Sequence, residues 1–266
     1  MCSGGGNLLK PLNRAYSGFF IFYPAFTLAE VLITLGIIGV VAALTIPTLI
    51  ANTRSSQYRS AFKKSISTLS QAARLSDSLY GFDYAGLTDQ CGTNASEEHP
   101  DSVMSVCALF NGTLTGLTYY SNASDIVMRK DGNNIQYTIF PDNSISGGGG
   151  TRGLSRFRAY ILSDGTIVGL YKDMGKAPCE LPVANSIKDS YSGGIMASCF
   201  GFIDVNGIAL PNREVSCTTG SNSLEQNTCV VKNNAQNMTD IYPVRFHDSI
   251  VEPATAAARY VLRTAK

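Results

Sequence analysis

The sequence predicts an α+β protein in which one long N-terminal helix, whose first half can span a membrane, packs on a C-terminal antiparallel β-sheet domain. Three observations lead to this prediction. An uncharged apolar run extends from Val31 to Thr53, an amphipathic pattern continues it to Tyr80, and turn-forming dipeptides separate short β-type segments further along the chain. The chain therefore divides into a helical first part and a β-rich remainder.

The apolar run is long enough to cross a lipid bilayer. As a helix with ~1.5 Å of rise per residue it measures ~35 Å, and the hydrocarbon layer is ~30 Å thick. We therefore expect residues 26–50 to form a transmembrane helix. Gly39 and Pro47 lie inside this segment, and a proline there is tolerated when neighbours satisfy the freed carbonyl. Glu30 stands near the edge of the run, where an ionised carboxylate is costly unless it is paired.

Residues 1–25 have the character of a leader peptide. The segment is rich in glycine and carries only two charges, both of them cations. A secretory signal places its apolar stretch before a small-residue cleavage site, whereas here the long apolar stretch follows the small residue Ala25. Cleavage between Ala25 and Phe26 would leave the helix on the product and create an amino group within ~6 Å of axial rise from Glu30. The amine of one copy could then neutralise the carboxylate of a neighbouring copy.

The string FTLAE, followed by an unbroken apolar run, resembles the processing site and helix of type IV pilins and of the pseudopilins of type II secretion. The resemblance implies that a prepilin peptidase cuts before Phe26 and methylates its new amine, and that Glu30 directs subunit docking. Gly39 and Pro47 fall where type IV pilin helices often have a Gly and a Pro. The resemblance also implies that the helix can lose regular hydrogen bonding near Gly39 and Pro47 in the assembled filament. The sequence departs from the family pattern at Ala25, where Gly is usual.

On this resemblance the chain has a type IV pilin-like fold and is a filament subunit, not an enzyme. It implies a single-pass protein of the bacterial inner membrane before assembly, and a periplasmic or cell-surface filament afterwards. The implied partners are other copies of the chain, minor pilins or pseudopilins, the prepilin peptidase and the assembly platform in the inner membrane. No cofactor is implied.

Two other interpretations fit the apolar run. One is a plain signal anchor whose Glu30 lies in the headgroup region. The other is a membrane-anchored periplasmic or extracellular binding protein or enzyme that uses residues 26–50 only as an anchor.

After the apolar run the pattern becomes amphipathic. Apolar side chains recur at three- and four-residue steps from Tyr58 to Tyr80, which predicts that residues 51–80 continue the helix as far as Gly81. This stripe should cover one face of a β-sheet. The intervening cations should face solvent or a neighbouring subunit: Arg54, Arg59, Lys63, Lys64 and Arg74.

Residues 81–266 should form one domain around an antiparallel sheet. The dipeptides Asp164-Gly165 and Asn206-Gly207 favour hairpin turns. Their flanking strand candidates are Arg158–Leu162 with Thr166–Tyr171, and Phe200–Val205 with Ile208–Leu210. A further strand candidate is Ile135–Phe140, whose side chains alternate in character.

The cysteines suit an exported protein. Six remain after the predicted cut: Cys91, Cys107, Cys179, Cys199, Cys217 and Cys229. An even number favours disulfides, although sequence alone cannot choose among the possible pairings. Closure of the shortest loops favours Cys91 with Cys107, Cys179 with Cys199, and Cys217 with Cys229. No CxxC pair or zinc-ligand spacing is present.

The sequence contains no recognisable catalytic residues or metal site. His99 and His247 lie far from any nucleophile turn, and we expect both on the solvated surface. Asp204, Asn206 and Asp240 are oxygen-ligand candidates for calcium, as acidic residues near the C-terminus are in the major pseudopilins, but the EF-hand spacing is absent and a turn-forming role of Asp204 and Asn206 is favoured. A net charge of +1 provides no basic field for nucleic acid.

Overall fold

The computed structural model describes residues 26–127, 154, 156–180 and 199–264. The leader with Ala25 and the strand candidate Ile135–Phe140 lie outside the described residues. The chain separates into two compact units, Met1–Ile46 and Pro47–Lys266, which are described individually. The boundary falls a few residues before the predicted end of the transmembrane segment.

The predicted long helix is present as α1, Leu28–Tyr80, and it includes Pro47 without interruption. It begins two residues later than predicted because Thr27 occupies the cap position, and its first turn is described below. At the other end, the amide of Gly81 donates a 3.0 Å hydrogen bond to the carbonyl of Asp77. Gly81 has a φ of 79°, a conformation that costs glycine little, so it ends the helix as predicted.

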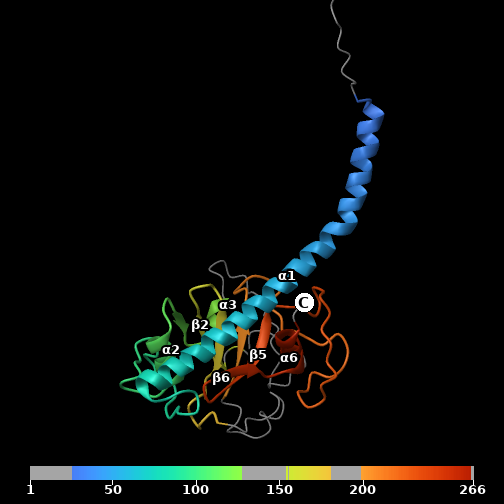
Figure 1. Cartoon of the computed structure of the whole chain (residues 1–266). Helices are drawn as coiled ribbons and strands as arrows, with labels where there is room; N and C mark the ends of the chain where they lie inside the picture. Colours follow the sequence, from blue (N-terminus) through green and yellow to red (C-terminus); the bar gives the residue numbers. More distant parts are fainter. Residues whose placement is uncertain (1–25, 128–153, 155, 181–198, 265–266) are drawn as a thin grey trace, which may run out of the picture. The chain divides into compact units, whose positions relative to one another are not determined.

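The second unit is built on a six-stranded sheet in which every neighbouring pair is antiparallel. The strands lie side by side in chain order (Figure 1). They are β1 Thr118–Tyr120, β2 Phe157–Ile161, β3 Ile167–Tyr171, β4 Phe200–Asp204, β5 Ile241–His247 and β6 Ile250–Pro253. The α+β class and the antiparallel sheet are therefore confirmed.

One of the two predicted hairpins is present. Asp164-Gly165 connects β2 to β3, whose last pair before the turn is Ile161 with Ile167. The prediction for Ile208–Leu210 was wrong, because these residues form turns and β4 pairs instead with β5. Local side chains favour the turns: the side-chain amide of Asn206 donates to the carbonyl of Leu210 and that of Asn212 donates to the carbonyl of Ile208, so these carbonyls are engaged outside a strand ladder.

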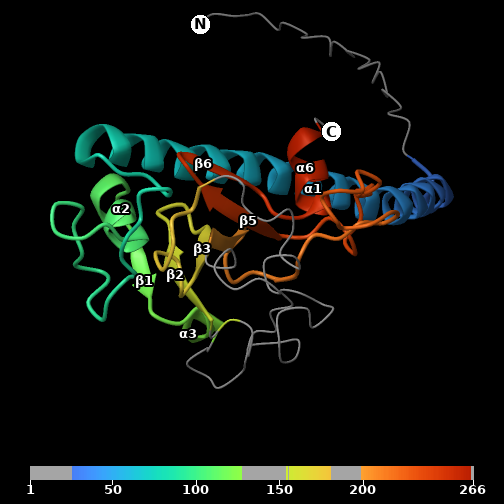
Figure 2. The same ribbon diagram turned by 90° about the horizontal axis from the view of Figure 1, so that it is seen from below.

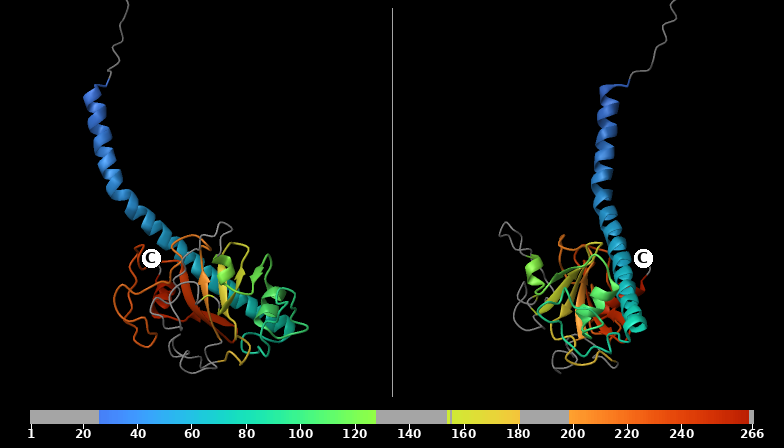
Figure 3. Two further views of the ribbon diagram at one scale, coloured as in Figure 1. Left: turned by 180° about the vertical axis from the view of Figure 1, so that it is seen from behind. Right: turned by 90° about the vertical axis from the view of Figure 1, so that its left-hand side faces the viewer.

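The part of α1 that follows Pro47 lies along one face of the sheet (Figures 2 and 3). Phe62 stacks on Tyr242 of β5 with ring centroids 4.1 Å apart. The hydroxyl of Ser70 accepts a 3.0 Å hydrogen bond from the amide of Val251 in β6. These contacts confirm that the amphipathic stripe covers the sheet, and Phe62 is fully buried as a result.

The prediction for Arg59 was wrong. We expected it to face solvent or another subunit, but only 6% of it is exposed. Its guanidinium donates to the side chain of Asn233 at 2.8 Å and to the hydroxyl of Thr264. Arg59 therefore fastens α1 to two C-terminal segments of the same domain.

Within the described ranges, three short helices were not predicted. They are α2 Val106–Thr113, α3 Ser124–Val127 and α6 Ala256–Arg263. The N-cap side chain of α2 is Ser105, which accepts from the amide of Ala108, and that of α6 is Thr255, which accepts from the amide of Ala258. Both are good capping residues, so their local sequences contained a usable signal.

Three disulfides fix the loops of the second unit. They join Cys91 with Cys107, Cys179 with Cys199, and Cys217 with Cys229. These are the pairings that loop closure favoured. In the chain-entropy model, closing loops of this length stabilises by about 3 kcal/mol each.

The second face of the sheet carries a close aromatic contact. The rings of Phe157 and Phe202 meet edge to face with centroids 5.3 Å apart. The ring of Phe202 lies over Gly169, its cross-strand partner in β3. A Cβ added to Gly169 would come within 2.0 Å of this ring. This strand position therefore requires the absence of a side chain.

We predict that Gly169→Ala lowers the free energy of unfolding by about 2 kcal/mol, because the new methyl group overpacks the core. Denaturant unfolding of the full chain in detergent, followed by near-ultraviolet circular dichroism, measures the effect. Phe202→Leu removes ring atoms at the same place, so the double variant should lose less stability than the sum of the single variants. Strictly additive losses would show that the two positions do not compete for space.

Candidate functional site

The first turn of α1 contains two reciprocal hydrogen bonds between Thr27 and Glu30. The amide of Glu30 donates to the Oγ1 atom of Thr27 at 3.2 Å, and the amide of Thr27 donates to Oε2 of Glu30 at 2.9 Å. The hydroxyl of Thr27 also donates to Oε2 at 2.9 Å. This is a capping box, in which two amides that the helix leaves without partners are satisfied by side chains.

The capping box leaves part of the Glu30 carboxylate accessible. Both hydrogen bonds from Thr27 end on Oε2, and within the described part of the chain Oε1 accepts none. The residue is exposed. One oxygen is therefore occupied inside the chain, while the other can receive a donor from elsewhere.

The following turns of α1 present an uncovered apolar surface. Among the described residues, α1 is the one helix long and apolar enough to cross a membrane, and none of its most apolar 18-residue window is buried. Large side chains such as Leu35, Ile38 and Leu44 are 61%, 63% and 73% exposed. Exposed apolar surface of this extent is typical of contact with lipid or with another protein.

Gly39 and Pro47 lie within this surface. A Cβ added to Gly39 would meet no atom of the described chain. Packing within the unit therefore gives no reason for a glycine at this position, and a close approach by another helix would. The expected loss of helical hydrogen bonding in a filament remains a proposal, because α1 is continuous through both residues.

The calcium candidates Asp204, Asn206 and Asp240 are engaged in hydrogen bonds within the chain, in a local turn at Asp204 and Asn206 and across two segments at Asp240. Asp204 Oδ1 accepts from the amide of Asn206 at 3.2 Å, and both oxygens of Asp240 accept backbone amides at 2.9 Å. Burial raises the pKa of Asp240, while these hydrogen bonds oppose the shift. The buried oxygens without a partner here belong to neutral side chains, including those of Asn206 and Thr239. Because the amides occupy the Asp240 carboxylate, the arrangement fits turn formation better than cation binding.

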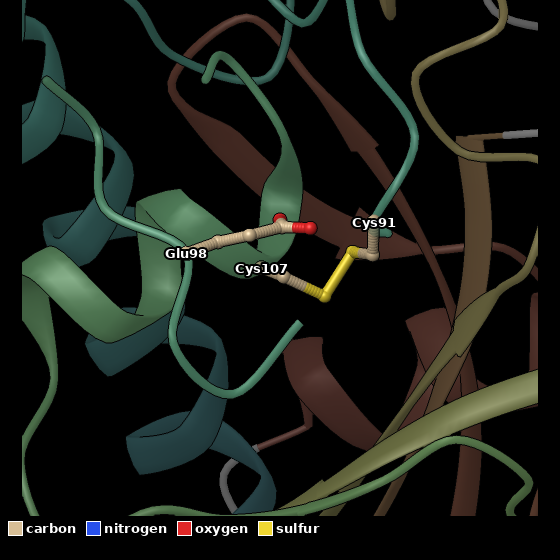
Figure 4. Close-up of side chains that lie close together, drawn as sticks. All are labelled: Cys91, Glu98 and Cys107. Atoms are coloured by element: carbon tan, nitrogen blue, oxygen red, sulfur yellow. A yellow bond between two sulfur atoms is a disulfide. The ribbon is translucent and has the colours of Figure 1, made fainter. Parts of the chain in front are cut away.

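A second cluster with metal-ligand chemistry contains Cys91, Glu98 and Cys107 (Figure 4). The two sulfurs are bonded to each other, so neither is a thiolate that could bind a metal. Glu98 accepts from the amide of Gly92 at 2.5 Å and from the hydroxyl of Ser105. Its role is therefore to hold the loop against the start of α2.

His247 is buried, contrary to our expectation of a surface residue, and only 3% of it is exposed. Its Nδ1 atom lies 2.8 Å from Oδ2 of Asp248, and its Nε2 atom lies 3.0 Å from Oε1 of Glu252. Arg245 donates from Nε to the same Glu252 oxygen at 2.6 Å. The sequence neighbours gave no sign of this burial. In β5 and β6, Arg245 pairs with Glu252, which places the Glu252 carboxylate within reach of both cationic side chains.

The charges of this cluster stabilise one another. The hydrogen bond to Glu252 raises the pKa of His247 despite the opposing effect of burial. The same hydrogen bond and the nearby Arg245 lower the pKa of Glu252 to about 2. Among the described residues no nucleophile lies within hydrogen-bonding distance of His247, so the cluster is best explained as a structural ion pair.

Comparisons with protein-family models, with curated proteins and with solved structures find no match to this chain. The functional argument therefore depends on the residues themselves. The capping box was missed in the sequence although its pattern, Thr-x-x-Glu before an apolar run, is a known signal.

We predict that the stability of the full chain declines as the pH rises from the ordinary histidine value through the raised pKa of His247. The pKa of His247 is raised in the folded state, so its contribution is complete below the ordinary value near ~6.5 and is lost above the raised value. The pKa of Glu252 is lowered, so its contribution is lost only as the pH falls towards about 2. Urea unfolding in detergent across this pH range measures the effect.

His247→Gln should remove this decline, which we expect to be about 1.5 to 3 kcal/mol, the scale of a hydrogen bond to a charged group. His99→Gln, at a histidine whose side chain is 52% exposed, is the matched control and should leave the decline unchanged. A decline of equal size in the His247→Gln variant would contradict this assignment.

Proposed function

We propose that this chain is a structural subunit of a type IV pilin-like filament, either a pilus or the pseudopilus of a secretion machine. The observation that carries the proposal is an uncovered apolar helix with an accessible carboxylate at its first turn. A prepilin peptidase cuts between Ala25 and Phe26, and the product then polymerises through residues 26–50. The second unit, which has its own core and three disulfides, is the exposed part of the subunit.

The side chains of the apolar helix are covered in two successive environments. Before cleavage it is an anchor in the inner membrane, which covers its side chains with lipid. After cleavage the helices of several copies pack together, and they cover the same side chains with one another. Gly39 supports close helix packing, because it has no side chain. No contact within the described chain requires a glycine at this position.

Glu30 supports a role in registering one subunit against the next. An ionised carboxylate in apolar surroundings costs about 2.5–3.5 kcal/mol or more unless a cation compensates it. The new amine of Phe26 is such a cation, and methylation preserves its charge. In an assembled filament the Phe26 amine of one copy pairs with Oε1 of Glu30 in another, while Oε2 stays in the capping box.

Cleavage is therefore the chemical switch in this mechanism. In the uncut chain the nitrogen of Phe26 belongs to a neutral peptide bond and cannot pair with a carboxylate. The uncut chain stays in the membrane as an anchor, and only the cut chain has both halves of the ion pair.

Three variants separate the charge of Glu30 from its capping role. Glu30→Gln keeps an oxygen that can accept from Thr27 but removes the charge, so we expect normal membrane insertion and no filaments. Glu30→Ala removes both and should also insert without assembling. Thr27→Ala removes the hydroxyl of the cap, costs about 1 kcal/mol of helix stability, and should still assemble.

Filaments are detected by electron microscopy of cells that carry each variant, and insertion by immunoblotting of the membrane fraction. Thr27→Ser keeps the hydroxyl and is the matched control for the cap. Normal filaments from Glu30→Gln would limit Glu30 to helix capping, and normal filaments from Glu30→Ala would refute any role in assembly.

A further inference from the structure

A groove in the second unit lies beside the end of the apolar run. It has a volume of 310 Å³. Ile50, Arg54 and Tyr58 line it from α1, and Leu210, Pro211 and Met238 line it from two loops. All six residues belong to the same compact unit, so their arrangement is defined within that unit. The groove therefore brings a distant loop next to the residues where the predicted transmembrane segment ends.

The loop carries exposed apolar side chains, and we call Ile208–Pro211 the apolar tip. Ile208 is 48% exposed and Leu210 is 72% exposed. Ile50, on the helix side of the groove, is also 48% exposed. The side chains of Ile208 and Leu210 do not belong to the buried core. The apolar tip is therefore exposed apolar surface that a partner or lipid could cover.

The apolar tip is held firmly against α1. The side-chain amide of Asn206 donates to the hydroxyl of Tyr58 at 3.2 Å and to the carbonyl of Leu210 at 3.5 Å. The side-chain amide of Asn212 donates to the carbonyl of Ile208 at 3.3 Å. Hydrogen bonds on both sides of the tip therefore fix its position relative to this part of the helix.

The position along α1 gives the depth of the tip relative to a bilayer. Arg54 follows Ile50 by four residues, which is ~6 Å along the helix axis. The headgroup layer of each leaflet is about 5–7 Å thick. If Ile50 marks the end of the hydrocarbon span, Arg54 lies at the depth of the headgroups. Leu210 shares the groove with both residues and therefore lies near the boundary between hydrocarbon and headgroups.

We propose that the apolar tip inserts into the phospholipid leaflet in which the transmembrane segment ends. The lipid covers Ile208 and Leu210, and Arg54 lies among the phosphate groups. This inference depends on the proposed function only in taking residues 26–50 as a membrane span. It adds a second membrane contact, which fixes the orientation of the domain on the membrane before assembly and must be released when the subunit leaves the bilayer.

Photo-crosslinking of the full chain tests the proposal. Leu210 is replaced by p-benzoylphenylalanine, the protein is reconstituted into vesicles of phosphatidylglycerol and phosphatidylethanolamine, and irradiated chains are analysed by mass spectrometry. We expect lipid adducts from position 210 and, in a second variant, from position 208. The same replacement at Leu79 is the matched control. Leu79 is 60% exposed but lies ~43 Å further along α1 than Ile50. It should give at least tenfold less lipid adduct.

A label at Leu44, inside the apolar run, separates the two proposals. Lipid adducts at position 44 without any at position 210 would overturn the insertion of the tip and leave the membrane span intact. Adducts between two copies of the chain from position 210 would also overturn it, because the occupant would then be another subunit. No lipid adduct at either position would contradict the membrane span and the proposed function with it.

Discussion

An apolar helix that its own chain leaves uncovered is the constraint on which the rest of this structure depends. Water cannot be its stable environment, since more than half of the surface of side chains such as Leu35 and Ile38 is accessible. Lipid or the apolar surface of another protein can cover it. Glu30 then becomes the decisive residue, because a carboxylate at the edge of such a surface must find donors. Thr27 supplies two of them within the chain.

The second half of α1 is an integral part of the globular unit. Phe62 and Leu69 complete the core under the sheet, and Arg59 ties the helix to the C-terminal segments. Disulfides hold the loops. The buried core of the second unit takes its helical residues from Phe62 onwards, well after Pro47. One continuous helix thus supplies buried core in the second unit and an exposed apolar surface in the first.

Much of this architecture could be predicted because it follows from local patterns. The apolar run and the stripe from Tyr58 to Tyr80 predict α1, and closure of the shortest loops favours the observed disulfides. The errors concern residues whose environment is set by distant partners. Arg59 is buried by contacts with Asn233 and Thr264. The residue after His247 makes backbone hydrogen bonds to Tyr84 and Cys179, and Asn206 donates to Tyr58. No local periodicity encodes such long-range contacts.

The central claim is that one helix is a membrane anchor before cleavage and a filament core afterwards. It requires a new amine at Phe26, since only that amine gives Glu30 a cation to pair with. Mass spectrometry of the protein isolated from its native cells measures this directly. The account predicts a mature chain that begins with N-methylated Phe26. A mature protein that retains residues 1–25 would contradict it.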